Sequence, residues 1–144
     1  MTIADNHAPQ ASGAVASDIE TRRLVTAKAW KRAGELPGKF FDDPMLFVNP
    51  ALNILLDLYI SFRENREVNV SSACIASGAP ATTALRYITR LLHLGLVQKT
   101  DDKKDLRVCY VDLTVTGKVR MEQSLDAAVD SDKRLGLARL RFEK

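Results

Sequence analysis

The chain has 144 residues, of which 46% are hydrophobic and 27% are charged. This length fits about one domain, and this composition excludes a disordered chain. The formal net charge of +3 fits an anionic partner, but so small a value does not by itself separate a nucleic-acid binder from other proteins.

Residues 1–16 consist largely of Ala with Ser, Gly, Asp, Asn and Pro and show no periodicity, so we expect a flexible tail. The stretch Ser17–Glu20 has the form of a capping box, in which each side chain satisfies a backbone N–H near the other. It predicts a helix that runs to about Gly34. The basic residues of this helix are expected to be exposed to solvent; they are Arg22, Arg23, Lys28, Lys31 and Arg32.

Residues 35–50 are punctuated by Pro and Gly, which predicts an irregular connection. Its large apolar side chains are expected to pack onto the core; they are Phe40, Phe41, Met45 and Phe47. The clearest helix of the sequence follows, because Asn49 suits the N-cap and Pro50 the first helical position. Leu52, Leu55, Leu56 and Tyr59 form its apolar stripe, and we expect it to end near Asn65.

A short extended piece at residues 67–70 precedes two short helices. We expect the first to begin at Ser71 or Ser72 and to stop at Gly78, and the second to span about residues 80–94 and to close at Gly95. Two helices joined by a tight glycine turn predict a helix-turn-helix. In this interpretation Cys74 is the small residue at the helix crossing, and Ala84, Ile88 and Leu91 face inward.

The outward face of the second helix carries polar side chains. Short hydroxyl groups followed one turn later by a guanidinium group suit base edges in the major groove and the neighbouring phosphates. The candidate DNA-binding residues of this helix are Thr82, Thr83, Arg86, Tyr87 and Arg90. A solvated helix face is the competing interpretation of the arginine pair, and Tyr87 fits the core as well as a DNA contact.

After Gly95 the pattern changes from helical to extended. Residues 96–100 and 106–113 are rich in Val, Leu and Tyr and are joined by five charged residues, which predicts a β-hairpin. Its candidate DNA contacts are Lys103, Lys104 and Arg107, although lysines in a turn also serve simply for solubility.

Thr114 is a candidate N-cap for a C-terminal helical region. An apolar stripe continues there that this chain alone cannot bury. The stripe comprises Val115, Val119, Leu125, Ala128, Val129, Leu135, Leu137 and Leu140. The polar residues 130–132 predict a division of this region into two helices.

No arrangement of residues in the sequence favours catalysis. The two histidines are His7 and His93, and there is no glycine-rich phosphate loop, no G-x-S-x-G and no Cys/His zinc spacing. Cys74 and Cys109 stand in no metal-type spacing, and neither a signal peptide nor a membrane span is recognisable. We therefore expect a cytoplasmic protein that is not an enzyme and holds no cofactor or metal; a redox role of the cysteines stays open.

These residues also carry a family resemblance. Asp105, Arg107, Val111, Leu113, Thr114 and Gly117 stand in the register D-x-R, an apolar residue, then L-T-x-x-G. This pattern resembles the wing of the winged helix-turn-helix in the MarR family of bacterial transcription regulators. Gly95 and Leu96 match the G-L that follows the family's recognition helix. The resemblance covers residues 73–117, about a third of the chain.

The resemblance implies a mainly α fold with a small β-hairpin wing, in which residues 49–113 form the DNA-binding domain. Residues 17–48 and 114–144 would form the base of a homodimer on a pseudo-palindromic double-stranded DNA operator. The family's recognition-helix arginine falls on Arg86, its minor-groove arginine in the wing (residues 96–113) falls on Arg107, and its wing-bracing aspartate on Asp105.

A small aromatic effector is a further implication of the resemblance. Its candidate lining residues are Trp30, Phe40, Phe41, Phe47 and Tyr59, which fit an ordinary core equally well. The alternative function is a winged helix that binds other proteins without specific DNA binding, because a fold alone does not fix the partner.

Overall fold

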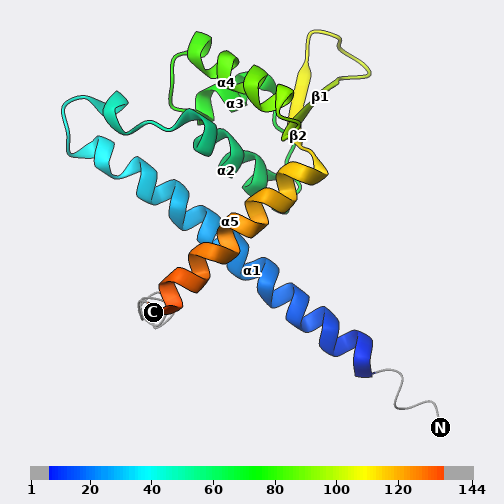
Figure 1. The fold of residues 1–144 in the computed structure, drawn as a ribbon. Coiled ribbons are helices and arrows are strands. Elements are labelled where there is room, and N and C mark those ends of the chain that lie inside the picture. The colour runs from blue at the N-terminus through cyan, green and yellow to red at the C-terminus, as the bar shows by residue number, and fades with distance from the viewer. Residues whose placement is uncertain (1–6, 135–144) are drawn as a thin grey trace.

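The computed structural model describes residues 7–134. Its elements, in chain order, are α1 (His7–Glu35), η2 (Pro37–Lys39), η3 (Pro44–Phe47), α2 (Pro50–Arg63), α3 (Val70–Ala76), α4 (Ala81–His93), β1 (Val97–Asp101), β2 (Cys109–Leu113) and α5 (Val115–Arg134). The helices α2, α3 and α4 and the hairpin gather at one end, while α1 and α5 cross and extend away from them (Figure 1). This is the predicted mainly α fold with a small β wing. None of the helices described has the length and apolar character needed to cross a bilayer.

Helix α2 is the centre of the core. Asn49 caps it as predicted, since its Oδ1 accepts a hydrogen bond of 3.2 Å from the backbone N–H of Leu52. The largest of its buried side chains are Ile54, Leu56, Leu58 and Tyr59, each no more than 2% exposed. The helix ends at Arg63, and Asn65 then turns the chain with a φ of +56°, a conformation that asparagine tolerates better than most residues.

Helix α1 begins ten residues earlier than predicted. Ser17 lies in its interior, where the Ser17 carbonyl accepts a 2.9 Å hydrogen bond from the hydroxyl of Thr21. The expected flexible tail was therefore too long, and residues 1–6 of it lie outside the described part of the chain. The physical reason is the alanine content of residues 8–16, because alanine has the highest intrinsic helix propensity.

Of the basic residues of α1, Arg22, Lys28 and Arg32 are exposed as predicted, whereas Arg23 and Lys31 are partly buried. The side chain of Arg23 is only 21% exposed and forms two hydrogen bonds to Asp126 and one, of 2.6 Å, to Glu122 on α5. The guanidinium group lowers the pKa of Asp126 through this hydrogen bonding. Lys28 pairs with Glu64 at the end of α2. These ion pairs fix α1 against both α2 and α5.

The aromatic connection does not join the core, so this prediction was wrong. Phe40 is 81% exposed, and Phe41, Met45 and Phe47 are also exposed. The reason is local: η2 and η3 pack mainly against each other, and η2 packs against α1. Within this connection the rings of Phe41 and Phe47 pack together, with centroids 4.8 Å apart.

Helix α5 is continuous to Arg134, so the predicted break at residues 130–132 is absent from the part of the helix described. Aspartate and serine cost only a few tenths of a kcal/mol in a helix interior, roughly, which does not break a long helix. From the predicted apolar stripe, Leu125 is fully buried while Val115 and Val119 stay exposed. Leu135, Leu137 and Leu140 lie outside the described residues.

Candidate nucleic-acid interface

Helices α3 and α4 and the turn between them form the predicted helix-turn-helix. Gly78 has a φ of +75°, and Gly95 ends the second helix with a φ of +71°, so both glycines occupy the left-handed region that favours this residue. Helix α3 begins earlier than predicted, because Asn69 caps it by accepting from the N–H of Ser72 over 2.8 Å. The fully buried small residue of α3 is Ala73, whereas Cys74 is half-buried.

Helix α4 is divided into an inner and an outer face. Ala84, Ile88 and Leu91 are buried, as predicted, because they fall on one side of a helix at intervals of three and four residues. Thr82, Arg86 and Arg90 are exposed on the other side, whereas Thr83 and Tyr87 are half-buried. Tyr87 packs against the core cluster, which favours its structural role over a DNA contact.

The wing is a two-stranded antiparallel hairpin in which Val97 pairs with Leu113 and Asp101 with Cys109. Its second strand starts at Cys109 and not at the predicted Leu106, because residues 102–108 form the turn. A short extended piece supports the hairpin from the other side, since the N–H of Val111 donates to the carbonyl of Val68 over 2.8 Å.

Asp105 and Arg107 are joined within the wing turn. The carboxylate of Asp105 accepts hydrogen bonds from the backbone N–H of Arg107 (3.0 Å) and from its Nε (3.1 Å) and Nη2 (3.2 Å). The side chain of Arg107 nevertheless remains 90% exposed. This geometry orients the guanidinium group outward from the turn, which is the arrangement that the resemblance implies for a groove contact.

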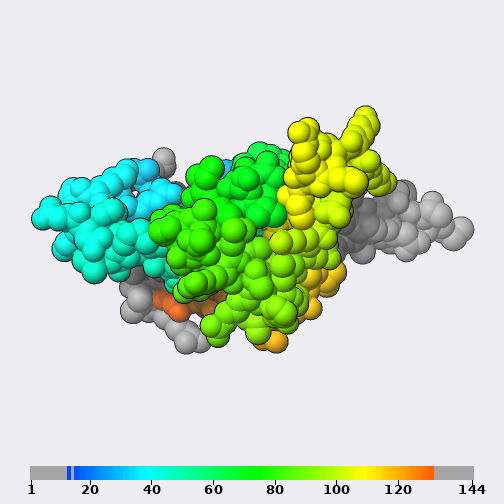
Figure 2. All heavy atoms as spheres, turned by 90° about the horizontal axis from the view of Figure 1, so that it is seen from above, coloured from blue at the N-terminus to red at the C-terminus, as the bar shows by residue number. Residues whose placement is uncertain are grey.

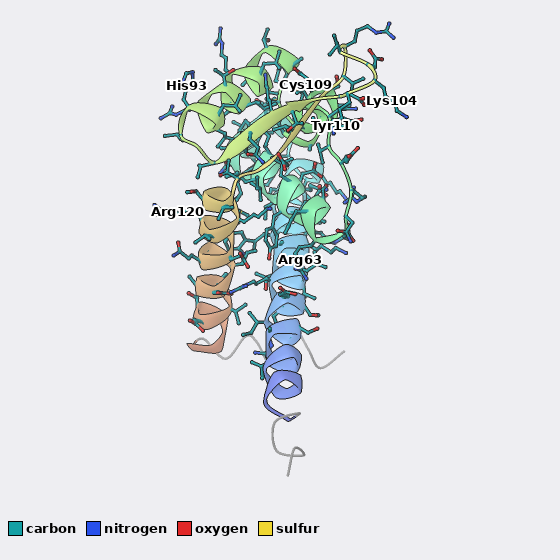
Figure 3. The ribbon with its side chains drawn as sticks, turned by 90° about the vertical axis from the view of Figure 1, so that its right-hand side faces the viewer. Arg63, His93, Lys104, Cys109, Tyr110 and Arg120 are labelled. Carbon is teal, nitrogen blue, oxygen red and sulfur yellow. The ribbon has the colours of Figure 1, made fainter. Side chains whose placement is uncertain are left out.

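Asp102 also holds this turn, a role that the sequence interpretation missed. One carboxylate oxygen accepts from the backbone N–H of Lys104 (2.8 Å), and the other accepts from the hydroxyl of Tyr110 (3.0 Å). Figure 3 shows Tyr110 and Cys109 at the base of the loop from which Lys104 projects. An aspartate two residues before a turn N–H is a recognised turn pattern, so the sequence did contain a local indication.

Acidification is expected to loosen this turn. Hydrogen bonds from the Lys104 N–H and the Tyr110 hydroxyl lower the pKa of Asp102, and those from Arg107 lower the pKa of Asp105, both below the ordinary 3.8. The carboxylates therefore stabilise the turn fully above pH 3.8, and this contribution is lost as the pH falls through the lowered folded-state pKa values. NMR titration of the two carboxyl groups checks this. A midpoint at or above 3.8 for either group contradicts the observed bonding.

The wing is anchored to α5 by the residues of the L-T-x-x-G motif. The hydroxyl of Thr114 donates to the carbonyl of Gly95 (2.6 Å) and accepts from the N–H of Gly117 (3.0 Å), so Thr114 caps α5 as predicted. A Cβ at residue 117 would overlap the carbonyl oxygen of Leu96. The glycine is thus required by a close approach of α5 to the chain that leaves α4.

The outward face of α4 and the wing lie side by side on one end of the molecule (Figure 2). Within residues 7–134, no ion pair engages Arg86, Arg90, Lys103 or Lys104. Unneutralised basic groups on exposed, adjacent elements form a surface suited to a polyanion.

The five aromatic residues expected around an effector do not form one pocket. Tyr59 belongs to the buried core and Trp30 packs against it, whereas Phe40 and Phe41 are exposed on the connection. Phe47 lines a hollow of about 470 Å³ between the end of α1, the connection and the helix-turn-helix. The aromatic effector therefore stays an expectation from the family resemblance.

In the part of the chain that the structure describes, no group of three or more His, Cys, Asp or Glu side chains is arranged to hold a metal ion. Cys74 and Cys109 are free and half-buried.

No protein-family model matches the sequence, and no curated protein does. The fold is similar to that of MepR, a transcription regulator of the Staphylococcus aureus multidrug efflux pump MepA, with 16% identity and a TM-score of 0.51 over 76% of this chain and 74% of that one. A MepR mutant has 16% sequence identity and a TM-score of 0.52, over 78% of this chain and 77% of that one. MepR in its complex with DNA has 16% sequence identity and a TM-score of 0.51, over 65% of this chain and 73% of that one. These similarities confirm the winged-helix fold.

Proposed function

We propose that this chain is a sequence-specific, double-stranded DNA-binding transcription regulator of MarR type that performs no catalysis. The observation that carries the proposal is the unpaired basic face of α4 beside a wing that holds Arg107 outward through Asp105. The likeness to MepR supports it, because MepR is a transcription regulator with the same fold and has been seen in complex with DNA.

In this proposal α4 enters the major groove. Arg86 and the hydroxyl of Thr82 reach base edges, and Arg90 and the wing lysines reach phosphates, because guanidinium groups bind guanine bidentately while ammonium groups act mainly as point charges. Arg107 enters the adjacent minor groove, where the negative potential attracts arginine. The half-buried Thr83 and Tyr87 contribute less than the exposed residues.

The proposal includes a homodimer built on α1 and α5. Val15, Ile19 and Val25 are exposed on α1, and Val119 is exposed on α5. The N-terminal part of α1 extends past the rest of the chain (Figure 1). Apolar side chains gathered on unpartnered helices indicate a protein interface. A two-fold dimer would present two copies of α4 about 34 Å apart, one turn of B-DNA, to the two halves of a pseudo-palindromic operator.

Selection of bound fragments from genomic DNA, repeated at two salt concentrations, tests this function. A regulator with roughly six phosphate contacts per dimer should select related pseudo-palindromic sites and lose about a thousandfold in affinity between about 50 and about 200 mM salt. A winged helix that docks only to proteins should enrich no fragment and show no such salt dependence. That result would reject the proposal in favour of the alternative function.

A further inference from the structure

The turn between α3 and α4 is held by a residue of α2. The side-chain amide of Asn53 donates a hydrogen bond of 2.9 Å from Nδ2 to the backbone carbonyl of Ser77. Ser77 is completely buried, so its carbonyl depends on a protein donor. The hydroxyl of Ser77 is already used inside the turn, since it donates to the carbonyl of Cys74 (2.6 Å) and accepts from the N–H of Ala79 (3.1 Å).

Helix α4 has no side-chain cap that would define its first residue. Pro80 occupies the N-cap position, makes no side-chain hydrogen bond there and has no backbone N–H. The start of the helix therefore depends on the conformation of the turn before it. Gly78, in the middle of that turn, lies against Asn53 and Val48, whose side chains stand 3.6–3.8 Å from the place that a Cβ would take.

We infer that Asn53 is a positioning residue for α4: by holding the Ser77 carbonyl, it sets where the helix begins and how it is directed relative to α2 and the wing. This inference rests on the proposed function, in which α4 reads DNA. Asn53 acts through the turn and not by contact with the bases.

Loss of the Asn53 donor leaves a buried carbonyl unsatisfied unless the turn moves and admits water. A shifted turn moves the first residues of α4, which include Thr82. Contacts to base edges depend on placement to within roughly 0.5 Å, whereas phosphate contacts tolerate more displacement. The specific component of DNA binding should therefore fall, and the non-specific component should remain.

The test compares two variants of α2. Asn53→Asp keeps the size of the side chain but replaces the donor with an oxygen that faces the Ser77 carbonyl. Asn49→Ala removes the cap of the same helix but leaves the hydrogen bond from Asn53 to Ser77 in place, so it serves as the matched control for loss of stability. For Asn53→Asp we expect about tenfold weaker binding to a selected site and a change of about twofold or less on random DNA. The Asn49→Ala control should keep the parent's ratio of affinity for the selected site to affinity for random DNA.

Hydrogen exchange of the DNA-free protein gives a second readout. The backbone amides of Gly78, Ala79 and Ala84 are hydrogen-bonded in and next to the turn. They should exchange faster in Asn53→Asp than in the parent, and at the parent's rate in Asn49→Ala, because only the first variant releases the turn. An unchanged binding ratio or unchanged exchange at the turn overturns the inference. If the parent selects no DNA at all, the proposed function fails instead, and the exchange data then decide whether Asn53 holds the turn.

Discussion

The Gly117→Ala variant is expected to lose about 3 kcal/mol or more of its free energy of unfolding. The added methyl group would overlap the carbonyl oxygen of Leu96, which is backbone and cannot move aside as a side chain tip can. Shifting α5 to make room would break the hydrogen bonds that Thr114 forms with Gly95 and Gly117. Urea denaturation followed by circular dichroism measures the change.

Gly34→Ala is the matched control, because Gly34 also lies in a helix, α1, but has no atom within 4 Å of the position that a Cβ would take. The same chemical change should stabilise the chain there by up to about 1 kcal/mol, since alanine favours a helix over glycine. If Gly117→Ala lowers the free energy of unfolding and Gly34→Ala raises it, the loss at residue 117 comes from the close approach and not from helix propensity. Equal stability of Gly117→Ala and the parent would mean that α5 does not lie against Leu96.

The elements that could be predicted from the sequence are those fixed by local chemistry. Asn49 caps α2 and Thr114 caps α5 because each hydrogen bond involves a neighbour three residues away. Gly78 and Gly95 end helices because both positions need a positive φ. The inner face of α4 followed from helical periodicity.

Two of the errors have a common physical origin, which is that a sequence pattern does not show which other element packs against a side chain. Phe40 and Phe41 were expected in the core because large apolar side chains usually lie there, but the connection that carries them packs on itself. Arg23 was expected in solvent because its partners, Glu122 and Asp126, lie about a hundred residues later in the chain. Sequence spacing contains no record of such contacts.

The candidate site also contains residues that local spacing predicts and residues that depend on contacts far apart in the sequence. The register of Asp105 and Arg107 follows from their spacing, and the two residues are indeed bonded to each other. Asn53 was not recognised, since its bond to Ser77 spans 24 residues and joins α2 to the turn after α3. The residues proposed to contact DNA were thus easier to predict from sequence than those that hold them in place.

Replacing Arg86 or Arg107 by alanine is expected to weaken binding to a selected operator by about thirtyfold or more each, because one base contact contributes about 1–3 kcal/mol and a dimer loses two. Stability should change little, since both side chains are exposed and the Asp105–Arg107 pair is a surface ion pair. Arg86→Ala should also relax the preference at one base pair of each half-site, whereas Lys104→Ala should weaken binding to all sequences evenly and lower the salt dependence. Fluorescence anisotropy with operator and mutated operators measures these effects.

The Arg120→Ala variant tests whether operator binding depends on where an arginine lies or only on the net charge of the protein. Arg120 is exposed on α5, away from the wing and α4 (Figure 3), so its removal lowers the net charge by the same amount without touching the proposed interface. If it weakens operator binding as much as Arg86→Ala does, the loss reports only the overall field of the protein, and the assigned contacts are wrong. If Arg120→Ala binds like the parent while the two interface variants do not, the contacts depend on where the guanidinium groups stand. That outcome is expected, because at physiological salt a charge more than about 8 Å from the nearest phosphate is largely screened.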